Sequence, residues 1–230
     1  MHDPKSIILL GSNHALTIFK EHCEDYGIEI HGIIDSDYYN NTASLEGIPV
    51  IGDENYLRDN LHGLRKEFAF FLAVNWLPTQ DAVTVRNRRK RQQWISLIKE
   101  LSLPCTNIVS DTAKISKSAK IGQNVFIGHF VVVEPRAILA DFSSVWDQGL
   151  VGHDCTIGEN SVLQRGTVLV GNVTVGRNAY LAPFCKVLNS VTVADESQLH
   201  PGVMVFRNTV AGEVVSSDRG NLRRIRVVDQ

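Results

Sequence analysis

The chain has 230 residues, of which 43% are hydrophobic and 21% are charged, and its net charge is -2. These values are typical of a soluble globular protein with one large or two small domains. The longest apolar run, 68–74, is far shorter than the roughly 18 residues that a membrane-spanning helix needs, so we expect no membrane protein. The balanced charge offers no general electrostatic attraction to nucleic acid.

The N-terminal residues MHDPKS lack the basic region, the long apolar stretch and the cleavage site of a secretory signal, so we expect a cytoplasmic protein. The four cysteines, Cys23, Cys105, Cys155 and Cys185, form no CxxC pair. This scatter favours reduced, buried thiols over a disulfide framework or a zinc site, and we expect no metal.

The composition changes near residue 110, where helix-forming and long charged residues give way to Val, Gly, Ile, Asn and Ser. We therefore expect two domains, at 1–110 and 111–230. In the first domain the hydrophobic pattern predicts strands at 6–11, 28–35 and 68–74, with helices at 14–27 and about 79–101. Strands that alternate with helices predict a small, Rossmann-like parallel α/β sheet.

Parallel sheets bind ligands at the carboxyl ends of their strands, which predicts a ligand site at this edge. The candidate residues are Gly11, Ser12, Asn13, His14, Asp35 and Asn75. The first loop has no GxGxxG spacing, which argues against a dinucleotide such as NAD. Asp35 is interpreted either as a cap of the strand end or as a contact to a ribose or a base.

A run of basic residues at 86–91 lies beside an apolar helical stripe formed by Trp94, Ile98 and Leu101. Such a run usually forms a solvated helix face, and we expect that here in preference to a nucleic-acid site. No nucleic-acid partner is therefore expected.

The second part of the chain repeats every six residues. From position 115 onward, every sixth residue is aliphatic: Ile115, Ile121, Ile127, Val133, Leu139, Val145, Val151, Ile157, Leu163, Leu169, Val175, Leu181, Val187, Val193, Leu199 and Val205. A small residue follows four positions after each, which lets the chain turn a tight corner. Three hexads make one coil of about eighteen residues, so the pattern predicts a parallel β-helix whose coils stack about 4.8 Å apart.

The outward positions of this β-helix carry apolar side chains, which predicts burial between subunits. They include Val132, Leu150, Val162, Val168, Val170 and Tyr180. His129, His153 and His200 are not separated by multiples of eighteen, so a shared zinc site is disfavoured. On the β-helix pattern alone, His153 is interpreted as a solvated outward side chain.

The whole chain resembles the bacterial nucleotide-aminosugar N-acetyltransferases and sialic acid O-acetyltransferases. The resemblance is carried by LLGSNHA, IIDSD, LEGIPVIGD, the hexads and, above all, VGHDCTIGEN at 151–160. It implies an N-terminal α/β domain that holds the nucleotide of a nucleotide-linked sugar. It further implies a C-terminal left-handed β-helix that assembles as a homotrimer and uses acetyl-CoA or another acyl-CoA as co-substrate.

The resemblance also implies site residues for direct acyl transfer in a ternary complex. His153 stands in the place of the general base, and an imidazole that titrates near neutral pH suits that task. Asp154 beside it would raise its basicity or fix its tautomer. Gly171 lies one coil later in the same column, and a glycine so placed offers its backbone N–H to the thioester oxygen.

Three residues depart from the family pattern around this histidine. Trp146, Gly152 and Val162 stand where the family commonly has an Asn, an acidic residue and a second His. Trp146 and Val162 are expected to line the acceptor pocket. The leading function is N-acylation of a nucleotide-linked sugar for polysaccharide or glycan synthesis. The alternatives are a sugar O-acyltransferase and a trimeric nucleotide-sugar-binding or regulatory protein with lost or altered catalysis.

Overall fold

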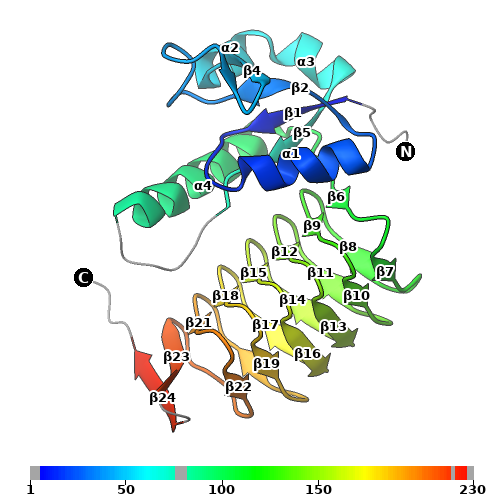
Figure 1. The fold of residues 1–230 in the computed structure, drawn as a ribbon, viewed down its shortest axis with the longest axis vertical. Helices are drawn as coiled ribbons and strands as arrows, with labels where there is room; N and C mark the ends of the chain where they lie inside the picture. The colour runs from blue at the N-terminus through cyan, green and yellow to red at the C-terminus, as the bar shows by residue number, and fades with distance from the viewer. Residues whose placement is uncertain (1–5, 76–81, 219–220, 227–230) are drawn as a thin grey trace. The chain divides into compact units, whose positions relative to one another are not determined.

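The computed structural model describes residues 6–75, 82–218 and 221–226. The chain divides into two compact units, Met1–Asn107 and Ile108–Gln230, which are described separately (Figure 1).

The first unit is built on a five-stranded sheet in the order β3-β4-β2-β1-β5. Its strands are β1 (Ser6–Leu10), β2 (Glu29–Ile34), β3 (Ser44–Leu45), β4 (Ile48–Gly52) and β5 (Ala69–Leu72). The neighbours β4, β2, β1 and β5 pair in parallel, and β3 joins β4 antiparallel at the edge. The apolar run Ile7–Leu10 is fully buried, as expected for a central strand that is covered on both faces.

The described part of this unit also contains the helices α1 (Leu16–Asp25), α2 (Glu54–Asp59), α3 (Leu61–Glu67) and α4 (Ala82–Leu101). Helix α1 buries Leu16, Phe19 and Cys23 on one face. It is followed by Gly27, whose φ of 65° is the left-handed conformation that glycine adopts readily. Asp53 caps α2, because its side chain accepts a hydrogen bond of 2.8 Å from the backbone N–H of Tyr56.

The three predicted strands and two predicted helices of this unit are present, and the sheet is mainly parallel as predicted. The predicted start of the last helix, near Thr79, lies outside the described residues. The hydrophobic pattern missed β3, β4, α2 and α3. β3 has two residues, β4 contains Pro49, and α2 and α3 have six and seven residues, about two helical turns at most, so none of them shows a clear period.

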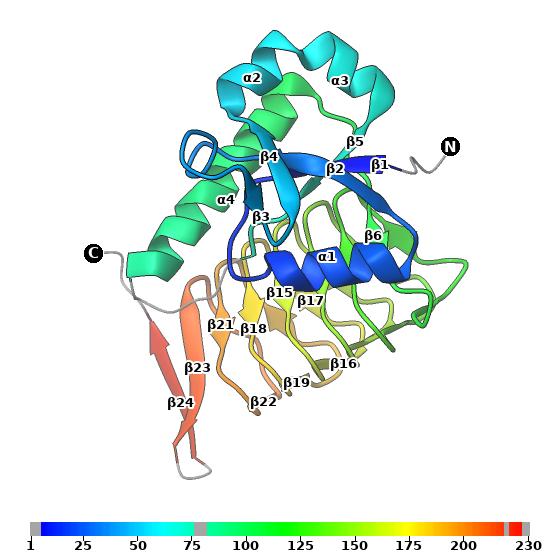
Figure 2. The ribbon, with the colours of Figure 1, turned by 45° about the horizontal axis from the view of Figure 1, so that its top comes forward.

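The second unit is a parallel β-helix whose short strands form three sheets (Figures 1 and 2). The β13 sheet contains β7 (Lys114–Ile115), β10 (Val132–Val133), β13 (Leu150–His153), β16 (Val168–Gly171), β19 (Lys186–Val187) and β22 (Met204–Val205). The β14 sheet contains β8 (Lys120–Ile121), β11 (Ile138–Leu139), β14 (Thr156–Ile157), β17 (Thr174–Val175) and β20 (Thr192–Val193). The β12 sheet contains β6 (Ile108–Val109), β9 (Phe126–Ile127), β12 (Ser144–Val145), β15 (Val162–Leu163), β18 (Tyr180–Leu181), β21 (Gln198–Leu199), β23 (Glu213–Asp218) and β24 (Asn221–Arg226).

The register of the coils confirms the six-residue repeat. Strands one coil apart pair with a shift of eighteen residues, for example Val133 with Val151 and Val151 with Leu169. Every predicted aliphatic position falls in a strand. The antiparallel pair of β23 and β24 closes the C-terminal end of the β12 sheet, as the orange and red strands of Figure 1 show.

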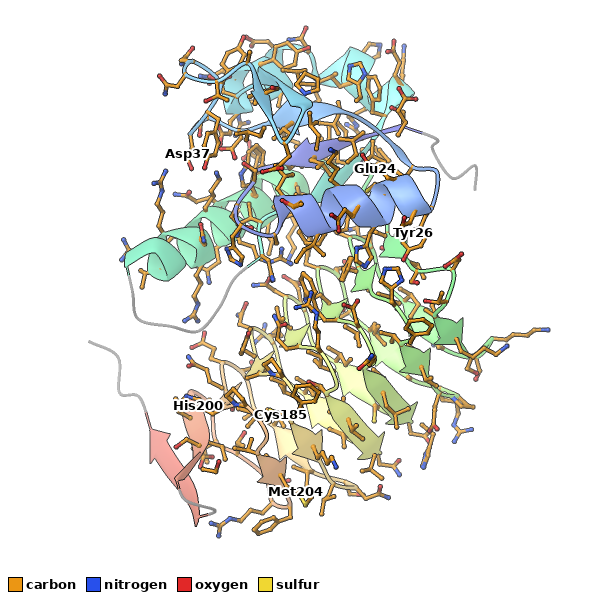
Figure 3. The ribbon with its side chains drawn as sticks, viewed as in Figure 1. Glu24, Tyr26, Asp37, Cys185, His200 and Met204 are labelled. Atoms are coloured by element: carbon orange, nitrogen blue, oxygen red, sulfur yellow. The ribbon has the colours of Figure 1, made fainter. Side chains whose placement is uncertain are left out.

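The predicted outward apolar residues differ in exposure. Val132 and Val170 are 38% and 42% exposed, and Met204, labelled in Figure 3, is 47% exposed on the same β13 sheet. In contrast, Val162 and Tyr180 on the β12 sheet are already buried within the single chain. The exposed apolar surface predicted from the sequence is therefore concentrated on the β13 sheet.

Candidate functional site

The candidate site in the β-helix lies where β13 and β16 end. These two strands have four residues where the other strands of their sheet have two, and their extension pairs His153 with Gly171. Gly152 makes this possible, because a Cβ at that position would lie 1.8 Å from the carbonyl oxygen of Val170. A residue with a side chain therefore does not fit at position 152 without displacing this backbone.

The imidazole of His153 lies over Gly171. A Cβ added to Gly171 would come within 2.7 Å of Nε2 and 3.0 Å of Cε1 of the histidine. The side chain of His153 is 45% exposed, so the ring is held against the backbone on one side and open on the other. The structure thus brings together His153 and Gly171, which the eighteen-residue spacing placed in one column.

Two carboxylates hold His153 in place. Asp154 Oδ2 lies 2.8 Å from Nδ1 of the imidazole, and Glu134 Oε2 accepts a hydrogen bond of 2.8 Å from the backbone N–H of His153. When Nδ1 carries the proton and donates a hydrogen bond to Asp154, Nε2 is unprotonated and keeps its lone pair. This is the state in which an imidazole accepts a proton from an attacking nucleophile.

Arg136 holds the carboxylate of Asp154 from the preceding coil. Its Nε and Nη2 donate to Oδ1 and Oδ2, each at 2.6 Å, in a bidentate ion pair. The hydrogen bonds from Arg136, and then that from His153, hold the pKa of Asp154 far below its usual range. Asp154 is therefore a carboxylate at every pH at which the protein would work.

Trp146 and Val162 do not join this cluster within the chain. Val162 lies in β15, and Trp146 directly follows β12, so both belong to the β12 sheet and not to the sheet that carries His153. Both side chains are buried. The ring of Trp146 packs 4.8 Å from that of Phe126, with the guanidinium of Arg165 5.2 Å from its centroid.

Glu134 and Arg136 are not predicted as site residues by the sequence pattern. The signal that could have found Arg136 is the coil length, because Arg136 stands eighteen residues before Asp154. Glu134 stands eighteen residues before Gly152, next to the column of the histidine.

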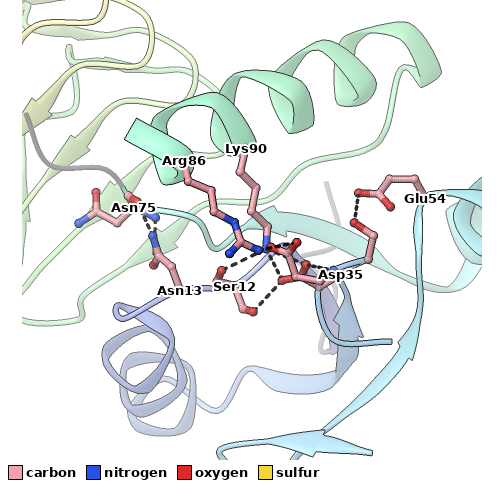
Figure 4. Close-up of polar contacts among 9 residues, drawn as sticks. Ser12, Asn13, Asp35, Glu54, Asn75, Arg86 and Lys90 are labelled. Atoms are coloured by element: carbon pink, nitrogen blue, oxygen red, sulfur yellow. Dashed lines mark hydrogen bonds and ion pairs between the residues drawn. The ribbon is translucent and has the colours of Figure 1, made fainter. Parts of the chain in front are cut away.

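The candidate ligand residues of the first unit meet at the carboxyl edge of its sheet (Figure 4). Asp35 is fully buried and accepts a hydrogen bond of 2.7 Å from Ser12 Oγ. Both of its carboxylate oxygens lie 2.7 Å from Nζ of Lys90. It also accepts the backbone N–H of Asp37 at 3.1 Å, as a strand-end cap does. The carboxylate is thus covered by partners from three segments of the chain.

A second carboxylate completes this charged cluster. Asp37 pairs with Lys90 at 2.7 Å and with Arg86 at 2.8 Å. Burial would raise the pKa of Asp37, but the hydrogen bonds and charges of Lys90 and Arg86 outweigh this effect and lower it. The charged cluster at this edge therefore consists of Asp37, Arg86 and Lys90, together with the fully buried Asp35.

The first loop is held by its own side chains. Gly11 has a φ of 65°, and an added Cβ would lie 2.5 Å from Val74 and 2.7 Å from the indole of Trp94, so only glycine fits. Asn13 donates from Nδ2 to the carbonyl of Asn75 and accepts the N–H of Ala15. His14 is exposed. Gly11, Ser12, Asn13, Asp35 and Asn75 thus come together as predicted from the strand order.

The prediction that the basic run 86–91 forms a solvated helix face is wrong for two of its residues. Lys90 is 11% exposed because it pairs with Asp35 and Asp37. Arg91 is buried, donates to the carbonyl of Val74 at 2.5 Å, and burial lowers its pKa to about 10. A basic side chain can be buried when it pairs with a carboxylate or donates to a carbonyl at the end of a strand. The charge pattern of the sequence does not reveal such partners.

Among the described residues, no helix has the length and apolarity to cross a bilayer. Nor do three or more His, Cys, Asp or Glu side chains of that part of the chain gather as a metal site would require.

No family model matches the chain. A curated relative is the bifunctional protein GlmU of Baumannia cicadellinicola subsp. Homalodisca coagulata, which is 25% identical over 129 residues, or 53% of this chain. The match covers 27% of that protein, so the chain spans only about a quarter of the length of this relative.

Solved structures match nearly the whole chain. PerB from Caulobacter crescentus, in complex with CoA and GDP-perosamine, has a TM-score of 0.78 at 20% identity, covering 95% of this chain and 97% of PerB. A histidine-to-asparagine variant of perosamine N-acetyltransferase from the same organism has a TM-score of 0.79 at 20% identity, with 95% and 96% covered. The acetyltransferase domain of PglB from Neisseria gonorrhoeae FA1090 has a TM-score of 0.79 at 20% identity, with 96% and 100% covered.

This chain therefore has the fold of these acetyltransferases: a small Rossmann-like α/β unit followed by a left-handed parallel β-helix. The predicted fold class is confirmed, and so, at the level of fold, is the resemblance to the hexapeptide-repeat acyltransferases.

Proposed function

We propose that the protein is an acyl-CoA-dependent N-acetyltransferase that acts on the amino group of a nucleotide-linked sugar. The observation that carries this proposal is the arrangement of His153, Asp154 and Gly171 at the ends of two extended strands, in a chain with the fold of CoA-bound acetyltransferases. PerB was crystallised with CoA and GDP-perosamine, and this pair of ligands supports the same two classes of substrate here.

In the proposed reaction, Nε2 of His153 removes a proton from the acceptor amine as the nitrogen attacks the thioester carbonyl of acetyl-CoA. The new C–N bond forms as the C–S bond breaks, and the proton held by the imidazole passes to the departing sulfur of CoA. Asp154 stabilises the imidazolium that forms between these steps. The backbone N–H of Gly171 is assigned to the carbonyl oxygen, where negative charge develops.

In the same proposal, the first unit binds the nucleotide of the acceptor. The charged cluster of Asp37, Arg86 and Lys90 and the polar loop of Ser12 and Asn13 lie at the carboxyl edge of the sheet, where parallel sheets bind their ligands. Asp35 contributes by holding Lys90 and Ser12 in place, and His14 and Asn75 flank the loop. We assign the first unit this role and the β-helix the transfer chemistry.

Trp146 and Val162 favour a second candidate, a trimeric protein that binds nucleotide-linked sugars with altered or lost catalysis. Both replace polar residues of the family pattern with apolar ones, and neither lies on the sheet of His153. If these residues line the acceptor pocket, they do so from another face of the β-helix, as an active site shared between subunits would allow.

A product screen separates the candidates. The purified protein is incubated with acetyl-CoA and a panel of UDP-, GDP- and dTDP-linked amino sugars, and each mixture is analysed by mass spectrometry for a gain of one acetyl group. Hydroxyl-bearing analogues that lack the amine serve as controls. Acetylation of an amino sugar alone supports the proposal, and acetylation of the hydroxyl analogues supports the O-acyltransferase. Binding without acetylation supports the second candidate.

A further inference from the structure

Three arginine–aspartate pairs join neighbouring coils of the β-helix across a spacing of eighteen residues. They are Arg136–Asp154, Arg165–Asp147 and Arg177–Asp195. The Arg136 pair is the shortest of them, with both N···O distances at 2.6 Å. Its carboxylate also bonds to the imidazole of His153.

We propose that Arg136 is a positioning residue of the transfer site, which fixes Asp154 so that Nδ1 of His153 holds the proton and Nε2 remains the base. The inference rests on the proposed function and extends it beyond the residues that touch the substrates. Arg136 acts only through Asp154, because its guanidinium bonds to the carboxylate and not to the imidazole.

The geometry explains why such a clamp is needed. The side chain of Asp154 is 30% exposed, and a partly exposed carboxylate can rotate unless a second partner holds it. A bidentate guanidinium fixes the plane of the carboxylate, and the carboxylate in turn directs Oδ2 at Nδ1. The imidazole, pressed against Gly171 on one side, is thereby held in a single orientation.

The test compares Arg136→Gln and Arg136→Lys with the matched control Arg177→Gln, which removes an ion pair of the same spacing far along the β-helix. Glutamine is tolerated at the left-handed backbone of Arg136 (φ 63°), because Gln148 adopts the same conformation at another corner. We expect Arg136→Gln to lower kcat about tenfold with both KM values unchanged.

The other two variants separate the geometry of the pair from its charge. Arg136→Lys keeps the charge but cannot form the bidentate pair with Asp154, so it should recover only part of kcat. Arg177→Gln should keep the wild-type kcat and KM values. A wild-type kcat in Arg136→Gln, or a loss carried by KM alone, would overturn the proposal.

Nitrogen NMR of labelled histidine tests the same inference without relying on turnover, with His153 assigned from a His153→Gln variant. We expect the Nδ1–H tautomer in the wild type and a mixture of tautomers in Arg136→Gln. Identical spectra in the two proteins would reject the role of Arg136. If the wild type transfers no acetyl group, the proposed function fails, and this measurement still decides the role of Arg136.

Discussion

Gly171 leaves no room for a side chain beneath the imidazole of His153. An alanine Cβ there would lie 2.7 Å from Nε2, and the backbone itself would accept alanine because φ is not positive. We therefore expect Gly171→Ala to fold normally but to displace the imidazole by several tenths of an ångström or more. Acetyl transfer should fall by about tenfold to a hundredfold with an unchanged melting temperature. Full activity in a correctly folded Gly171→Ala protein would remove this glycine from the site.

Asp35 and Lys90 form a buried pair in the first unit, and their substitution has a distinct signature. Asp35→Ala leaves the ammonium of Lys90, which is 11% exposed, with Asp37 as its remaining carboxylate. We expect a loss of about 2–4 kcal/mol in the free energy of unfolding. The double variant Asp35→Ala/Lys90→Met should recover most of this loss, because the ammonium that lost its buried carboxylate partner is removed as well. Urea denaturation of the single and double variants measures the difference, and equal losses would show that the pair is not coupled.

Among single residues, the sequence predicted those that belong to the coil repeat or to a recognisable motif. It did not predict the residues whose role depends on an ion pair with a distant residue. His153 and Asp154 follow from the HDC motif, and Gly171 from its position eighteen residues after His153. Lys90 was missed because a charged residue in a basic run is read as solvated, and its carboxylate partners lie 53 and 55 positions away in the sequence. Side-chain pairing across such distances depends on the strand order, which composition does not encode.

The extended strands β13 and β16 depend on Gly152. A Cβ at this position would lie 1.8 Å from a backbone oxygen, which cannot move without breaking the strand pairing. We expect Gly152→Ala to lower the free energy of unfolding by at least about 2 kcal/mol. As a control, Gly63→Ala in helix α3 meets nothing within 4 Å and should raise stability by about 0.5–1 kcal/mol. A Gly152→Ala protein as stable as the wild type would show that the strand ends adjust freely.

The elements show why the β-helix was predictable in detail and the first unit only in outline. The hexads repeat through sixteen strands, so each aliphatic position supports the register of the next. In the first unit, β4 (Ile48–Gly52) is a single edge-side strand interrupted by Pro49, and α2 and α3 have six and seven residues. Segments this short are stabilised by tertiary packing, and their local pattern carries little signal.

The whole molecule is proposed to be a homotrimer. The β13 sheet exposes Val132, Val170 and Met204, and Leu188 and Phe206 are exposed directly after two of its strands. Such an apolar surface is normally buried in an assembly. Light scattering coupled to size exclusion at micromolar concentration should report three chains per particle. Val170→Glu should weaken the trimer, whereas a polar substitution at the already buried Val162 would destabilise the chain itself. A stable wild-type monomer would contradict both the trimer and a site shared between subunits.

The most direct test of the central claim is the rate of acetyl transfer by the wild type and by His153→Ala, measured with acetyl-CoA and the amino sugar identified in the product screen. We expect a loss of about a hundredfold or more in kcat, with KM for both substrates largely kept, because the imidazole is needed for proton removal and not for binding. The fold should survive, since the side chain is 45% exposed. Equal rates in the two proteins would mean that His153 is not the base and would contradict the account.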